Sequence, residues 1–82
     1  MTSEDLKKLI SASINTHKIQ VYSPDNKHFD VMIVSETFSE MKTIERQRKI
    51  YSIINGDILS GKIHAITLKT YDLVEWVKNE NL

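Results

Sequence analysis

Two segments with the pattern of β-strands, separated by a short polar loop, constrain the fold of this chain more than any other feature. Residues 18–22 and 29–34 are rich in β-branched and aromatic side chains, and their apolar residues alternate with a period of two. The loop at residues 23–27 has the sequence Ser-Pro-Asp-Asn-Lys, in which proline presets φ while Asp and Asn tolerate turn geometry. The pattern predicts a β-hairpin with a polar loop.

Helical patterns flank this hairpin. Apolar residues three and four positions apart predict a helix over residues 3–14. Charged and apolar residues interleave over residues 43–54 in a pattern typical of a second helix. We expect Asn55-Gly56 to interrupt or end that helix, and a short helical turn to follow at residues 57–60.

A third strand and a last helix complete the predicted fold. Residues 63–71 have the composition of a strand, and Asp72 to Glu75 form a near-capping box that opens a final helix. The predicted order is αββααβα, an α+β architecture in which helices pack on one face of a small three-stranded sheet. The other face is expected to be partly open, and Tyr51, Ile54 and Ile58 are expected in the core.

Length and composition narrow the possible functions. At 82 residues, we expect residues 1–82 to form a single domain with one core. Eleven basic residues balance eleven acidic ones, whereas a dedicated nucleic-acid binder usually carries a basic excess. With no cysteine, the chain has no thiolate of its own, so redox or cluster chemistry would need the thiols of a partner. No apolar run approaches the roughly 18 residues of a membrane span, and the first residues lack a signal-peptide pattern, which favours a cytoplasmic location.

The three histidines are candidate metal ligands. No two of them stand at the i, i+4 spacing of a helical zinc pair, so a zinc site within this chain alone is not expected. His17 lies in a predicted connection, where a solvated loop histidine is the ordinary interpretation. His28 ends the hairpin loop and is either a solvated loop residue or a ligand, and His64 by itself would be a half-buried strand histidine.

Other chemistry has weaker support. The run at residues 45–49 contains Arg46, Arg48 and Lys49, which could contact phosphate, although mixed charge on a helix is more often its solvated face. With only two glycines, the chain has neither a glycine-rich phosphate loop nor a dinucleotide fingerprint. Nothing in the sequence resembles a nucleophile elbow. We therefore predict that the protein is not an enzyme.

Several segments together resemble the BolA-like family. The similarity runs over essentially the whole chain, and its most specific part is an Ile-His-Ala step followed at fixed spacing by Glu-Trp. The likeness is closer to the short bacterial branch of the IbaG/YrbA type, whose hairpin loop is similar to Asp25-Asn26-Lys27-His28-Phe29. The segments that carry the resemblance are residues 29–38, residues 46–51, Ile63-His64-Ala65-Ile66-Thr67-Leu68 and Glu75-Trp76.

The resemblance implies a fold, a partner and a cofactor. The fold would be similar to the class II KH domain, and the partner would be a monothiol glutaredoxin. In such complexes a 2Fe-2S cluster is shared between the glutaredoxin cysteine, a glutathione thiol and ligands from the BolA-like chain. The resemblance assigns His64 as one ligand and His28, in the hairpin loop, as the second. The implied role is non-enzymatic: cluster trafficking, or iron, redox and stress regulation, with no cluster on the isolated chain.

An alternative follows from the same resemblance. A KH-like fold and the regulatory role of some relatives suggest a nucleic-acid-binding transcriptional regulator, for which Arg46, Arg48 and Lys49 are the candidate contacts. Against it, this chain lacks the Gly-x-x-Gly loop of the KH clamp. The sequence also departs from the family at Ser39-Glu40-Met41, where a glycine is often found, so the connection into the second helix is expected to differ.

Overall fold

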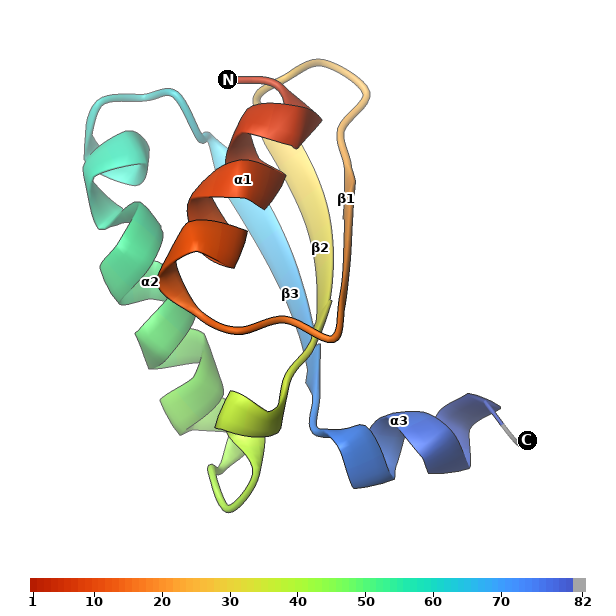
Figure 1. Ribbon diagram of the computed structural model, residues 1–82. Helices are drawn as coiled ribbons and strands as arrows, with labels where there is room; N and C mark the ends of the chain where they lie inside the picture. The colour runs from red at the N-terminus through yellow and green to blue at the C-terminus, as the bar shows by residue number, and fades with distance from the viewer. Residues whose placement is uncertain (81–82) are drawn as a thin grey trace.

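The computed structural model describes residues 1–80 and contains three α-helices and three strands (Figure 1). The near-capping box predicted for the last helix forms, since Asp72 and Glu75 exchange side-chain to backbone hydrogen bonds of 2.8 Å. The first helix also begins with a capping box, made by Thr2 and Asp5. The elements are α1 (Ser3–Ser13), β1 (Lys18–Tyr22), β2 (His28–Val34), the 3₁₀ turn η1 (Glu36–Phe38), α2 (Thr43–Leu59), β3 (Ala65–Tyr71) and α3 (Leu73–Glu80).

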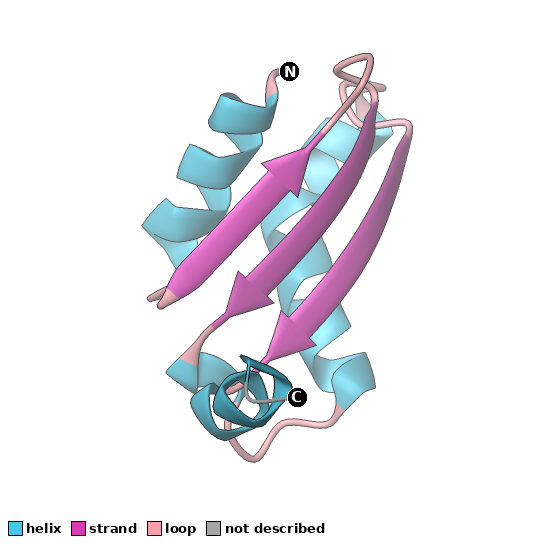
Figure 2. Ribbon diagram, turned by 90° about the vertical axis from the view of Figure 1, so that its right-hand side faces the viewer, coloured by secondary structure: helices cyan, strands magenta, loops and turns pink. Residues whose placement is uncertain are grey.

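The sheet is mixed, with β2 in the centre. β1 and β2 form the predicted antiparallel hairpin, and β2 and β3 run parallel, with α2 in the crossover between them. Figure 2 shows α1 and α2 behind the sheet and the opposite face uncovered, with α3 projecting from the end of β3. The α+β class and the layering of helices on one face are therefore confirmed. None of the described helices has the length and apolar character that a membrane span needs.

The core lies between the sheet and the two long helices. Leu6 and Ile10 of α1 and Ile50 and Ile54 of α2 are fully buried, and they pack in one cluster with the inward residues of β2. Burial of such side chains contributes about 1.5–3 kcal/mol each. Along β2 the buried residues Phe29, Val31 and Ile33 alternate with His28, Asp30 and Met32, which face the open side of the sheet.

Two expectations about α2 are wrong. The helix continues through Asn55-Gly56 to Leu59, so the separate turn at residues 57–60 does not exist. Ile54 and Ile58 lie on either side of Gly56 and pack against the core. Glycine in a helix costs about 1 kcal/mol relative to alanine, and the packing of these two side chains outweighs that cost. The helix ends instead at Leu59 and is followed by the C-cap residue Ser60 and by Gly61, whose φ is +82°.

The prediction that Tyr51 lies in the core is also wrong, since this side chain on α2 is 39% exposed. Ile54 is fully buried as expected, and Ile58 is partly buried against the core. Helical periodicity groups Tyr51 with Ile54 and Ile58, but the buried stripe of α2 runs through Arg46, Ile50 and Ile54, and Tyr51 lies beside it.

The connection into α2 turns at Glu40, which has a φ of +66°. This left-handed conformation costs an ordinary L-residue about 1 kcal/mol and favours glycine. Backbone hydrogen bonds from Ser39 to Glu36 (3.0 Å) and from Met41 to Phe38 (3.1 Å) hold the turn. In this segment the family often has a glycine, and here Glu40 adopts the left-handed conformation that a glycine would favour.

The two glycines should respond oppositely to alanine. At Gly56 an added Cβ meets nothing within 4 Å, so Gly56→Ala should stabilise the protein by about 0.5–1 kcal/mol through higher helix propensity. At Gly61 the positive φ makes alanine strained, so Gly61→Ala should destabilise it by about 1 kcal/mol. Urea unfolding of both variants checks this pair, and a loss of stability at Gly56 would contradict it.

Candidate metal-ligand site

The parallel pairing of β2 and β3 brings His28 and His64 together. His28 begins β2 opposite Ala65, and His64 immediately precedes β3. The Lys27 carbonyl accepts hydrogen bonds from the backbone N–H groups of His64 (2.8 Å) and Ala65 (3.3 Å), which joins the two strand starts. The imidazole centroids lie 6.1 Å apart in an edge-to-face arrangement, and both residues are exposed. Two distant positions in the sequence therefore form one imidazole pair.

The hairpin loop is organised around the side chain of Asp25. Its Oδ1 accepts hydrogen bonds from the backbone N–H groups of Lys27 (3.0 Å) and His28 (2.9 Å), and its Oδ2 lies 2.6 Å from His28 Nδ1. Hydrogen bonds from the His28 amide, the His28 ring and the Lys27 amide hold the pKa of Asp25 well below its usual range. Asn26, with a φ of +61°, makes the loop turn that this clamp requires.

Ser23 supports the other side of the loop. Its Oγ accepts a hydrogen bond from the Asn26 amide (2.9 Å) and donates one to the His28 carbonyl (2.6 Å). The backbone of His28 is thus held on both its N–H and its C=O. The sequence pattern predicts only a polar turn at residues 23–27 and does not identify a role for Asp25. The available signal was a carboxylate three residues before a histidine.

His17 does not join the imidazole pair. Its backbone N–H donates to the carbonyl of Val34, the last residue of β2, whereas His28 is the first residue of that strand. The two residues therefore lie at opposite ends of the sheet.

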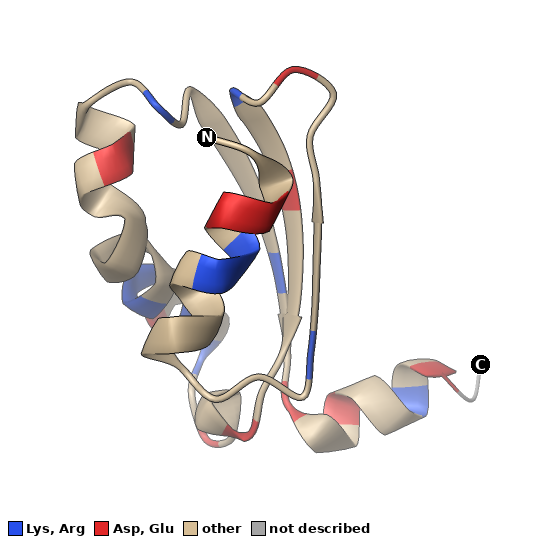
Figure 3. Cartoon of the chain, turned by 45° about the horizontal axis from the view of Figure 1, so that its top comes forward, with Lys and Arg blue, Asp and Glu red and all other residues tan. Residues whose placement is uncertain are grey.

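The candidate phosphate contacts on α2 are not equivalent. Arg48 and Lys49 are exposed, but Arg46 is only 6% exposed. Its guanidinium donates to the carbonyls of Met41 (2.9 Å) and Thr70 (3.3 Å) and to Glu75 (2.6 Å), so it is a structural group and not a surface contact. Each helix carries both basic and acidic residues (Figure 3). This surface gives the nucleic-acid alternative little support.

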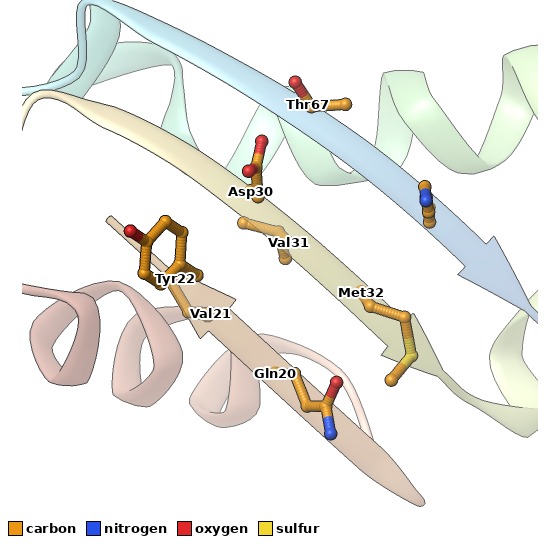
Figure 4. A pocket seen from close by; sticks show the side chains of 8 residues that line it. Gln20, Val21, Tyr22, Asp30, Val31, Met32 and Thr67 are labelled. Atoms are coloured by element: carbon orange, nitrogen blue, oxygen red, sulfur yellow. The ribbon is translucent and has the colours of Figure 1, made fainter. Parts of the chain in front are cut away.

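The open sheet face borders the imidazole pair. A hollow of about 530 Å³ lies on it, lined by side chains of all three strands. Tyr22, Asp30 and Thr67 form the row next to the His28–Ala65 pair, and Figure 4 shows them on neighbouring strands. The face is partly apolar, since Tyr22 is 64% exposed.

The donor set suits a metal site that another molecule completes. Within residues 1–80, no group of three or more His, Asp or Glu side chains is placed to hold a metal ion. His28 and His64 nevertheless offer two exposed imidazoles, and imidazole nitrogen is a good ligand for iron. His28 and His64 therefore fit two of the four ligand positions of a 2Fe-2S cluster.

The architecture defines the structural class. A mixed three-stranded sheet with helices on one face is the fold of known BolA structures. The chain matches the structure of BolA1 from Arabidopsis thaliana with a TM-score of 0.79 at 20% identity, covering 89% of this chain and 93% of that one.

The sequence comparisons establish the family. Residues 8–75 match the family described as BolA-like protein, and the chain belongs to this family. A Buchnera aphidicola protein (subspecies Schizaphis graminum) is 32% identical over 80 residues, which cover 98% of this chain and 99% of that protein. The acid stress protein IbaG of Escherichia coli K12 is 27% identical over 82 residues, covering all of this chain and 96% of IbaG. The resemblance inferred from the sequence is confirmed.

Proposed function

We propose that this protein binds a monothiol glutaredoxin and shares a 2Fe-2S cluster with it, with His64 and His28 as the ligands from this chain. The observation that carries the proposal is the exposed imidazole pair, 6.1 Å between centroids, in a member of the BolA-like family that has no cysteine. A cluster of this type is held by four ligands. Two imidazoles leave two positions for thiols, which the glutaredoxin cysteine and glutathione would supply.

The role of this chain would be that of a non-enzymatic adaptor. Neutral imidazole in place of thiolate lowers the negative charge around the iron, and histidine ligation raises the reduction potential in Rieske centres. The exposed sheet face beside the histidines offers a surface on which the partner can rest. Such a complex suits cluster trafficking or iron and redox regulation, and the relative named acid stress protein is consistent with a role in stress.

Co-expression tests this proposal. We expect the chain co-purified with a monothiol glutaredoxin and glutathione to show the visible absorbance of a 2Fe-2S cluster, because only the complex offers a full ligand set. The chain purified alone should be colourless. Glutaredoxin expressed without this chain is the control, since its own cluster should give a different visible circular dichroism spectrum. A stoichiometric cluster on the lone chain, or no complex at all, would contradict the proposal.

A further inference from the structure

We infer that Asp25 is a positioning residue that selects the tautomer of His28, placing the ring proton on Nδ1 and leaving Nε2 free as the ligand atom. The role of this tautomer in metal binding rests on the proposed function, whereas the tautomer itself can be measured in the free protein. It is carried by the contacts of one carboxylate, whose Oδ1 holds the loop backbone and whose Oδ2 holds the ring.

The carboxylate fixes the ring because it is itself fixed. Oδ1 is held by the backbone N–H groups of Lys27 and His28, so Asp25 cannot rotate away without losing both hydrogen bonds. Oδ2 lies 2.6 Å from Nδ1, a short distance typical of a charge-assisted hydrogen bond. Rotating the imidazole to present Nδ1 to a metal would break this contact and leave Oδ2 without the ring.

The chemistry of the pair determines which nitrogen carries the proton. An ionised carboxylate only accepts hydrogen bonds, so Nδ1 must be the donor. In the neutral ring, Nε2 then keeps its lone pair. Metal-bound histidines commonly donate their second ring N–H to a carboxylate, which orients the ring and raises its basicity. Asp25 therefore prepares His28 as a ligand before any metal arrives.

His64 provides an internal contrast. Within residues 1–80, its ring has no hydrogen-bonding partner and lies edge-to-face with the His28 ring. Its backbone is held through Lys27, but no hydrogen bond from the described residues selects its tautomer. The two candidate ligands thus differ: the structure prepares the ring of His28 and leaves that of His64 free to adapt.

The substitution Asp25→Asn separates selection of the tautomer from support of the loop. Asparagine keeps an Oδ1 that accepts from the two backbone amides, and it then presents an NH₂ donor to the ring in place of Oδ2. A donor there favours an unprotonated Nδ1, so the proton should move to Nε2. Asp30→Asn is the matched control in the free chain, because it makes the same change of charge at an exposed position in β2, the strand that His28 begins.

The experiment uses long-range ¹H–¹⁵N correlation spectra of the histidine rings in the free, ¹⁵N-labelled chain. The spectra are recorded at about pH 8.5, well above the ordinary imidazole pKa of about 6.5. We expect the Nδ1–H form for His28 in the wild type and in Asp30→Asn, and loss of that form in Asp25→Asn, with His64 unchanged. A neutral His28 ring with its proton on Nε2 in the wild type, or an unchanged His28 tautomer in Asp25→Asn, would overturn the inference.

A second arm links this result to the cluster. In the glutaredoxin complex, Asp25→Asn should weaken cluster retention by about 10–100-fold, the usual effect of removing the partner of a ligand. Asp57→Asn is the control in this arm, because it makes the same change of charge on α2, outside the open sheet face, and it should retain the cluster as the wild type does. If no wild-type complex holds a cluster, the proposed function fails while the tautomer result stands. If Asp25→Asn changes the tautomer but not the cluster, the positioning role toward the metal is refuted.

Discussion

Replacing His64 with alanine is expected to remove the cluster from the glutaredoxin complex while the free protein stays folded. The imidazole of His64 is exposed and contacts the ring of His28, so its loss opens no cavity in the core. The strand start remains joined, because the bond from His64 to Lys27 uses the backbone N–H. The cost in stability should stay within about 0.5 kcal/mol.

The measurement is the visible absorbance and circular dichroism of the co-purified complexes, with thermal melts of the free chains as a folding control. His28→Ala should cause a smaller spectral change, because water or a neighbouring group can replace a loop ligand. His17→Ala should cause none, since His17 lies at the other end of the sheet. A normal cluster spectrum in His64→Ala would refute the ligand assignment. Unfolding of the free variant would instead make His64 a structural residue.

Replacing Arg46 with methionine is expected to destabilise the free protein by about 2–4 kcal/mol. The Arg46 guanidinium bonds the carbonyl of Met41 before α2, the carbonyl of Thr70 in β3 and the carboxylate of Glu75 in α3. Methionine preserves most of the aliphatic volume but leaves the two carbonyls without these donors. Each hydrogen bond to a charged group contributes about 1.5–3 kcal/mol. The expected loss of stability is smaller than the sum of the three hydrogen-bond contributions, because the side chain of Glu75 is 48% exposed and can form hydrogen bonds with water instead.

Urea unfolding measures this effect, and Arg48→Met is the matched control. Arg48 lies on the same helix but is exposed, so its replacement should change stability by no more than about 0.5 kcal/mol. Glu75→Ala should fall between the two variants, because Glu75 also closes the capping box of α3 through the Asp72 amide. Equal stability of the two arginine variants would show that the Arg46 contacts add nothing.

The local pattern of the sequence determined the elements. Alternation in residues 18–22 and 29–34 predicted the hairpin, whose strands the structure places at Lys18–Tyr22 and His28–Val34. The near-capping box at Asp72 and Glu75 forms as expected at the start of α3. These features depend on neighbours a few positions away, so the sequence carries the information directly.

Tertiary structure decided the features that depend on distant neighbours. Whether α2 passes through Gly56 depends on the core packing of Ile54 and Ile58, and a propensity argument does not include that energy. Whether an arginine is a surface charge or a buried link depends on the carbonyls opposite it. Arg46 and Arg48 are two positions apart on one helix, yet only Arg46 faces β3 and α3.

The candidate site divides in the same way. The family resemblance selected His28 and His64 from the sequence, but only the parallel pairing of β2 and β3 brings their rings to 6.1 Å. The bond between Asp25 and His28 joins residues that are close in the chain, and it still could not be predicted. Many turn conformations place these two side chains apart, and the one adopted depends on how Ser23, the loop backbone and the strand starts fit together.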